Sequence, residues 1–323
     1  MNGAFLINKH AGVSSFGIIE QLKDVGIKKF GCNYQQLPQD FQKMGHGGTL
    51  DPFATGLLIV CVGRGVKLSR YFLGSVKGYD ATFRFGETTI PGDPTAEVSE
   101  RCDRLPESLE KLQEMADRFS AQPYLQTPPM HSAKKKGGKP LYELARQGIE
   151  VDREPKLCHL YDFRFTEYNK PEAMASVSCS SGTYIRTLAQ DFARLFETVG
   201  MLSTLHRTHS GCFSDEQAMT VDQIDSFVGD EKDWEKLPCF VPFDRLLQGY
   251  ARADATDDEA ACLLQGKQNV LFSILNRVTE SPDASAYSRS SDTVTIYSHG
   301  RLLAVAKQEN SVWGLERVFP TTP

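Results

Sequence analysis

The segment GHGGTLDPFATGLLIVCVGRGVKLSRYF, which begins at Gly45, contains the side chains that are best placed to do chemistry. Its carboxylate, Asp51, follows three glycines, and glycine lets a loop take the positive φ angles that a compact shape requires. The segment is not a phosphate-binding loop, because threonine and leucine follow its last glycine where lysine and then serine or threonine are needed. Taken alone, Asp51 followed by Pro52 is also typical of a helix N-cap or a turn.

A second group of reactive side chains consists of His206, His209 and Cys212, whose even spacing could in principle suit a metal ion. The surrounding LHRTHSGCF is typical of a strand, which points alternate side chains to opposite faces. We therefore expect no metal site here.

Length and composition indicate an ordinary globular protein: 323 residues, 40% of them apolar and 24% charged, enough for one large domain and one smaller domain. The longest apolar stretch, residues 57–62, is far shorter than the roughly 20 residues of a membrane-spanning helix. The opening MNGAFLINKH lacks the pattern of a signal peptide, and the eight cysteines contain no C-x-x-C pair, which favours reduced thiols. We expect a cytoplasmic location.

The net charge of −5 argues against a nucleic-acid-binding protein, whose usual mark is a surplus of basic residues. A local basic patch is nevertheless compatible with an acidic whole, and a run of lysines interleaved with two glycines forms one. The same run also suits a solvated loop. It consists of Lys134, Lys135, Lys136 and Lys139.

The predicted elements mix strands and helices. The start of the chain predicts a strand followed by a helix that is capped by Ser14 or Ser15. KGYDATFRFG predicts a half-buried strand, and PESLEKLQEMADRF predicts a helix. Residues 28–44 show neither the helical nor the strand period. CHLYDFRFTEY and MASVSCSSGTYIRTLAQDFARLF predict two strands, a tight turn and a helix, with acidic helices to about Gly249. TVTIYSHGRLLAVAKQ predicts a hairpin that turns at His299.

Four motifs, in order, resemble the TruB family of pseudouridine synthases. The family's catalytic motif is resembled by GHGGTLDP followed by ATG, and its K-x-Y strand by KGYDATFRFG. Its RNA-binding insertion is resembled by PPMHSAKKKGGKPLYELARQGIEVDRE, and its arginine motif by SSGTYIRTLAQD. The closing HGRLLAVAKQENSVWGLERVF resembles a PUA-type RNA-binding module. The resemblance implies an α+β pseudouridine synthase fold over residues 1–248, with a mixed, largely antiparallel central sheet flanked by helices and an insertion at about 128–155. A small β-rich PUA-like domain would occupy 249–323.

The resemblance also assigns roles to single residues. Asp51 falls on the essential aspartate, which attacks the target uridine as its N-glycosidic bond breaks. Arg186 of GTYIR is expected to pair with Asp51, because a guanidinium favours the charged form of a carboxylate that burial disfavours. Asp93 matches a carboxylate on the other side of this arginine. Tyr79 matches the aromatic residue that stacks on the target base, a contact that contributes roughly 1 to 3 kcal/mol.

Further positions follow from the same match. Tyr184 and Leu205 would line the uridine pocket, His46 would contact RNA beside the flipped base, and the four lysines of the insertion would bind RNA. The implied reaction needs no cofactor: the base leaves C1′, turns in the pocket and rejoins through C5, with attack at C6 or at C1′ both compatible. Flipping uridine 55 out of the tRNA T loop costs a few kcal/mol. The basic insertion suits clamping the T arm and is expected to be disordered without RNA.

The chain departs from the family pattern in three places: NKHAG, where relatives usually have proline after the lysine, an extra segment around residues 30–43, and Gly47 with Thr49 inside the catalytic motif. Two alternatives remain. A guide-RNA-dependent rRNA synthase is disfavoured by the long insertion, and a non-catalytic tRNA-folding chaperone by the intact Asp51 and Arg186. We expect a monomer that acts on tRNA without guide RNA and without a membrane.

Overall fold

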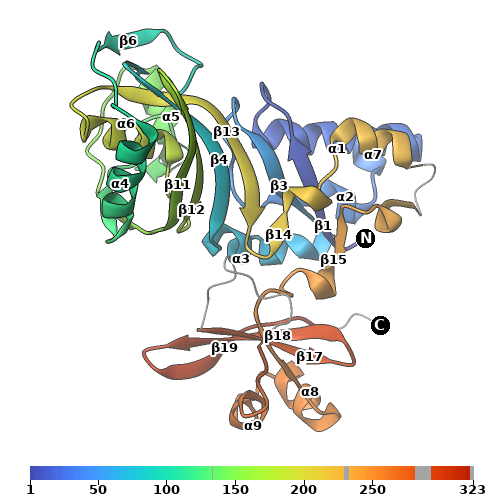
Figure 1. Cartoon of the computed structure of the whole chain (residues 1–323). Coiled ribbons are helices and arrows are strands. Elements are labelled where there is room, and N and C mark those ends of the chain that lie inside the picture. The colour runs from blue at the N-terminus through green and yellow to red at the C-terminus, as the bar shows by residue number, and fades with distance from the viewer. Residues whose placement is uncertain (133, 229–232, 281–291, 321–323) are drawn as a thin grey trace.

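The computed structural model describes residues 1–132, 134–228, 233–280 and 292–320, which form a large central sheet and a smaller C-terminal sheet (Figure 1). The strands are β1 (Gly3–Lys9), β2 (Met44–His46), β3 (Thr55–Val62), β4 (Lys77–Phe85), β5 (Glu87–Thr89), β6 (Val98–Arg101), β7 (Tyr124–Gln126), β8 (Lys135–Lys136), β9 (Lys139–Pro140), β10 (Lys156–Cys158), β11 (Leu160–Asn169), β12 (Glu172–Cys179), β13 (Gly200–Ser210), β14 (Phe213–Ser214), β15 (Phe240–Pro242), β16 (Ala251–Asp254), β17 (Thr293–Ser298), β18 (Arg301–Glu309) and β19 (Val312–Val318). The helices are α1 (Ser15–Phe30), α2 (Gln39–Gln42), α3 (Ser69–Gly74), α4 (Leu109–Ser120), α5 (Leu141–Arg146), α6 (Ile185–Arg194), α7 (Val221–Phe227), α8 (Asp257–Leu264) and α9 (Leu271–Leu275).

The large sheet has the strand order β11-β12-β4-β13-β3-β1-β15, with β2 paired to β3 and β14 to β13. Its neighbours are antiparallel except β13 and β3, which run parallel, so the sheet is mixed and largely antiparallel. Figure 1 shows α4 and α6 at the β11 end of this sheet and α1 and α7 at the β1 end. The parallel junction of β3 and β13 therefore lies inside the sheet, where β2 and β3 also meet.

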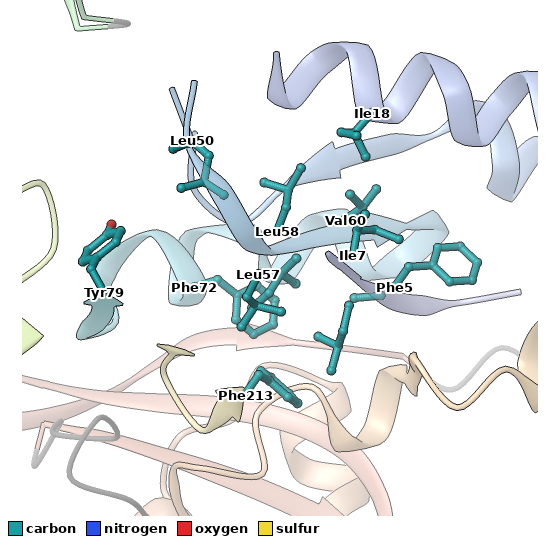
Figure 2. Close-up of a cluster of buried hydrophobic side chains, with 14 of the residues drawn as sticks. Phe5, Ile7, Ile18, Leu50, Leu57, Leu58, Val60, Phe72, Tyr79 and Phe213 are labelled. Carbon is teal, nitrogen blue, oxygen red and sulfur yellow. The ribbon is translucent and has the colours of Figure 1, made fainter. Parts of the chain in front are cut away.

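Local sequence accounts for several of these elements. Helix α1 begins after Ser14, whose hydroxyl accepts a hydrogen bond from the amide of Gly17, as expected of an N-cap. Helix α4 is capped by Ser108, whose hydroxyl accepts from the amide of Lys111; Pro106, two residues upstream, lies outside the helix. Strand β4 alternates as predicted, with Tyr79 on its buried face. Apolar side chains of β1 and β3 form the core shown in Figure 2 together with Ile18 of α1, Phe72 of α3 and Phe213 of β14.

The segment 30–43 packs against the core rather than forming a loose excursion. Phe41 is buried, and its ring contacts Phe30 at 5.4 Å and Trp234 at 4.7 Å between centroids. The prediction of acidic helices up to Gly249 was wrong in part, because β15 pairs with β1 and closes one edge of the sheet. A strand of three residues is too short to show a period of two in the sequence.

The C-terminal sheet has the order β16-β17-β18-β19, and its hairpin turns at His299 and Gly300 as predicted. Side chains hold it against the short 3-10 turn Phe243–Arg245, which follows β15: the Tyr297 hydroxyl donates to the Asp244 carbonyl at 2.9 Å, and the rings of Phe319 and Phe243 lie 5.3 Å apart between centroids. Among the described residues, no helix has the length and apolar character needed to cross a membrane.

Candidate active site

Asp51 lies in the loop that joins β2 to β3. These strands pair antiparallel, so residues 47–54 close a hairpin, and Asp51 opens a turn in which its carbonyl accepts from the amide of Ala54 at 3.1 Å. The residue is therefore in a turn and not at a helix N-cap. Gly47, one of the departures from the family pattern, is required by packing here, because a Cβ at this position would lie 2.6 Å from Cβ of Phe72.

The side chain of Arg186 meets Asp51 in a two-point ion pair. Nε of Arg186 donates to one carboxylate oxygen at 2.7 Å and Nη2 to the other at 3.0 Å. The arginine side chain is 3% exposed, whereas that of Asp51 is 30% exposed. The buried guanidinium thus fixes the carboxylate from behind, while the carboxylate keeps an open side toward solvent. A bidentate pair of this kind also fixes orientation.

The remaining donors of Arg186 are also bound. Nη1 donates to the carbonyl of Pro91 at 2.8 Å and lies 3.5 Å from the carboxylate of Asp93, and Nη2 donates to the carbonyl of His131 at 2.8 Å. Asp93 is held in turn by Thr95, whose amide donates to it at 3.0 Å. Arg186 stands in the first turn of α6, so the helix, the 91–95 loop and the start of the insertion converge on one guanidinium.

Three further cations are buried behind the Asp51 loop, and we call them the loop cations: Lys9, Lys77 and Arg207. Lys9 donates to the carbonyls of His10, Val13 and Pro52. Arg207 donates to the carbonyls of Leu57, Gly48 and Thr49. Lys77 donates to the carbonyls of Phe72 and Ser75 and to the Ser75 hydroxyl. Within the described ranges, no carboxylate lies in ion-pair distance of these three.

Burial shapes the protonation of the two lysines. It lowers the pKa of Lys9 to about 8 and that of Lys77 to about 7. The charge of Asp51 raises the pKa of Lys9 in part, and the charge of Arg207 lowers the pKa of both lysines. A charged ammonium loses hydration when it is buried, and hydrogen bonds to neutral carbonyls replace only part of it. Lys9 and Arg207 therefore hold the Asp51 loop by binding carbonyls of its backbone, whereas Lys77 binds the end of α3 and the residue after it.

The predicted pocket residues lie around this centre. Tyr79 is 8% exposed and faces Arg207 across β4 and β13, and burial raises the pKa of its phenol to about 12. Figure 2 shows it at the margin of the apolar cluster around Leu57. Leu205, on β13, is buried as well. Tyr184 immediately precedes α6, two residues before the paired arginine.

His46 lies on β2 and is partly buried. Its Nδ1 is buried and has no hydrogen-bond partner among the described residues, and burial lowers the pKa of the ring.

The insertion consists of the β8-β9 hairpin and α5, set on a stem made by β7 and β10. Residue 133 lies outside the described residues. Lys134 and Lys139 are exposed, whereas the side chains of Lys135 and Lys136 are outside what the structure describes. The predicted disorder of this segment without RNA stays a prediction.

His206 does not meet His209 and Cys212 in a ligand cluster. Its ring lies between the Thr55 hydroxyl and the Asp215 carboxylate, each at 2.7 Å. The parts of the chain that the structure describes contain no group of three or more His, Cys, Asp or Glu side chains that could hold a metal ion.

Several contacts of this centre were not predicted from the sequence, namely those of the loop cations and those of Arg186 with the carbonyls of Pro91 and His131. Almost all of these contacts are made with backbone groups, which leave no mark in a residue pattern. Only Lys77 had a signal, because it opens the K-x-Y strand.

Comparison with known proteins shows the family of this chain. A family model described as TruB family pseudouridylate synthase (N terminal domain) matches residues 36–185. The tRNA pseudouridine synthase B of Bordetella pertussis is 40% identical over 228 residues, which cover 69% of this chain and 87% of that protein. The protein of the same name from Saccharophagus degradans is 36% identical over 291 residues, covering 88% of this chain and 87% of that protein.

A solved structure shares the architecture. A chain in the crystal structure of a Cbf5-Nop10-Gar1 complex superposes with a TM-score of 0.67, covering 98% of this chain and 84% of its own length. The two sequences are 19% identical, so this likeness shows the fold alone.

Proposed function

The chain belongs to the TruB family of pseudouridine synthases, and from this membership we propose that it isomerises a uridine of tRNA to pseudouridine, at position 55 of the T loop. The observation that carries the proposal is the two-point pair of a half-open Asp51 carboxylate with the buried Arg186. A carboxylate fixed in this way can face an entering nucleotide without changing its own position. The relatives named above are both called tRNA pseudouridine synthase B, which favours tRNA as the substrate.

In the proposed reaction Asp51 attacks the flipped uridine, and the bond from C1′ to N1 breaks. The base turns within the pocket and a bond forms from C1′ to C5. The proton lost from C5 goes to solvent and N1 gains one, so the composition of the nucleotide is unchanged and no cofactor takes part. Arg186 stabilises Asp51 as the attacking carboxylate, and Asp93 holds the far side of the guanidinium.

The pocket residues have roles that suit a flipped base. Tyr79 is proposed to stack on the uracil ring, with Tyr184 and Leu205 completing the pocket. His46 is proposed to contact the RNA beside the extruded nucleotide. These contacts offset the few kcal/mol that unstacking a base costs.

Two segments outside the pocket are proposed to bind the rest of the tRNA. Lys134, Lys135, Lys136 and Lys139 of the insertion would neutralise phosphates of the T arm. Residues 249–323 would act as a PUA-like RNA-binding domain, and 1–248 as the catalytic domain.

The test of the proposed reaction is release of tritium from C5-labelled uridine in unmodified tRNA, with the full-length protein and no guide RNA. The wild type is expected to release label, and Asp51→Asn is expected to release none. Asp225→Asn serves as a matched control, because this aspartate pairs with Lys28 and Lys29 away from the site. A wild type that needs guide RNA would favour the guided synthase, and one that only refolds tRNA would favour the chaperone. Retained activity in Asp51→Asn would remove the nucleophile assignment.

The proposed role of the insertion is tested by binding. Changing Lys134, Lys135 and Lys136 together to Ala is expected to weaken tRNA binding and to reduce the slope of log Kd against log salt by about 0.7 for each phosphate that the variant no longer neutralises. The control carries the same charge change on α1, at Lys23, Lys28 and Lys29. Equal salt slopes for the wild type and the insertion variant would refute the role.

A further inference from the structure

Gln126, at the end of β7, makes an unusual pair of contacts with the arginine motif. Its side chain is buried, at 1% exposure. The amide nitrogen donates to the carbonyl of Tyr184 at 3.0 Å, and the amide oxygen accepts from the backbone N–H of the same residue at 2.7 Å. One side chain thus binds both backbone groups of the residue that precedes α6, where Tyr184 has no side-chain cap of its own.

The position of Gln126 in the chain connects this clamp to the insertion. Strands β7 and β10 pair antiparallel, with Gln126 opposite Lys156, so residues 127–155 leave the body of the protein directly after Gln126 and return directly before Lys156. The first turn of the insertion touches the same motif, since the carbonyl of His131 accepts from Nη2 of Arg186. Arg153 closes the base by donating to the carbonyl of Pro128 at 3.2 Å.

We propose that Gln126 is a positioning residue that transmits the placement of the insertion to Tyr184 and Arg186. This inference rests on the proposed function, because it takes the insertion as the segment that grips RNA. When RNA fixes the insertion, the β7-β10 stem and the His131 carbonyl are fixed with it. The clamp on Tyr184 then holds the start of α6 and, two residues on, the guanidinium that orients Asp51.

The chemistry of the clamp requires an amide. Gln carries both a donor and an acceptor, so it satisfies the N–H and the C=O of Tyr184 at once. Methionine has a similar length and no polar head, and leaves both groups unpaired. An ionised glutamate accepts from the N–H but sets a negative charge against the carbonyl, whereas a protonated glutamate recovers the donor.

The chain offers a matched control in Gln113 on α4. Its amide makes the same type of double contact, accepting from the N–H of Phe165 at 2.8 Å and donating to the carbonyl of Phe163 at 3.2 Å. These residues lie on β11, at the edge of the sheet, and hold no part of the proposed site. Gln113→Met therefore removes an equivalent clamp in a place where only stability should respond.

The experiment compares single-turnover rates at saturating tRNA, tRNA Kd values and thermal stabilities of wild type, Gln126→Met and Gln113→Met. Gln126→Met is expected to slow the single-turnover rate about tenfold to hundredfold, because small displacements of a catalytic group have large effects on rate, with Kd changed less than about threefold. Gln113→Met is expected to keep the wild-type single-turnover rate and the wild-type Kd. An unchanged rate in Gln126→Met, or a loss of binding as large as the loss of rate, would overturn the proposal.

Two further readouts separate positioning from simple loss of stability. The rate of Gln126→Glu relative to wild type is expected to rise as the pH falls from about 8 to about 6, since burial favours the protonated acid that restores the donor. The corresponding ratio for Gln126→Met should stay flat, and two flat ratios would contradict the clamp. Hydrogen exchange of the peptide around Tyr184, measured without RNA, should be faster in Gln126→Met. This last measurement needs no turnover, so it tests the clamp even if the proposed reaction fails.

Discussion

Two groups of buried charge surround the Asp51 loop, and they are satisfied in opposite ways. On one side, Arg186 is bound by two carboxylates, those of Asp51 and Asp93. On the other side, the loop cations are bound by backbone carbonyls and one hydroxyl. Arg186 and the loop cations are all almost fully buried, so the difference between them lies in their partners and not in their exposure.

The difference indicates a division of labour. A carboxylate placed beside the loop cations would neutralise them, and it would also compete with Asp51 for a position at the pocket. Carbonyls bind these side chains without adding negative charge, so Lys9 and Arg207 fasten the backbone of the Asp51 loop with no carboxylate beside them. The ion pair therefore orients the carboxylate of Asp51, whereas Lys9 and Arg207 fix the backbone of the loop that carries it. Substitutions on the two sides should differ in whether rate or stability changes more.

The largest effect is expected from Arg186→Lys. Lysine keeps the charge but cannot reproduce the planar fork that binds both oxygens of Asp51 and the carbonyls of Pro91 and His131. We expect the single-turnover rate to fall by about 10²-fold to 10³-fold, a loss typical of removing one preorganised donor, with a smaller change in stability. The measurement is the tritium-release rate at saturating tRNA beside urea unfolding. A rate close to wild type would mean that charge alone is sufficient.

A smaller effect, on stability, is expected from Arg207→Met. The substitution removes hydrogen bonds to the carbonyls of Leu57 and Gly48, which are buried residues, and to that of the exposed Thr49. The free energy of unfolding should fall by about 2 to 4 kcal/mol, since each unsatisfied buried group costs about 1 to 3 kcal/mol. Urea unfolding measures this, with the exposed Arg245→Met as control. If Arg207→Met were as stable as the control, the loop cations would not be structural.

Much of the fold and of the ion pair could be predicted from the sequence. The alternation in KGYDATFRFG placed Tyr79 on a buried face, and the resemblance to the family implied the mixed sheet and the small C-terminal sheet, both confirmed by the structural comparison. Asp51 and Arg186 are 135 residues apart, and only the two family motifs connected them. The roles of these residues remain predictions that the experiments above test.

The remaining contacts of the site and the core could not be predicted from the sequence, and the reason is physical. Lys9 and Arg207 bind carbonyls, which every residue has, so no pair of side-chain types marks their contacts. Gln126 acts on the backbone of Tyr184 in the same way. Phe41 packs on Trp234, and this contact depends on a loop path that has no periodicity.

The smallest effect, and the one most specific to the loop cations, is the pH dependence of stability in Lys77→Met. Burial lowers the pKa of Lys77 from 10.5 to about 7. Above about pH 7 the unfolded chain therefore binds a proton that the native protein does not, and the unfolding free energy of the wild type rises with pH by at most about 1.4 kcal/mol per unit for this group.

Lys77→Met lacks this contribution, so the difference in unfolding free energy, wild type minus variant, should grow from about pH 7 to about pH 9 and stay constant below that window. Urea unfolding across this range measures it, with the exposed Lys67→Met as control. Parallel curves for the wild type and Lys77→Met would show that Lys77 stays protonated in the native protein. The carbonyl partners of Lys77 would then compensate fully for the hydration that its ammonium loses on burial. Binding by carbonyls and binding by carboxylates, as in Arg186, would no longer differ in energy.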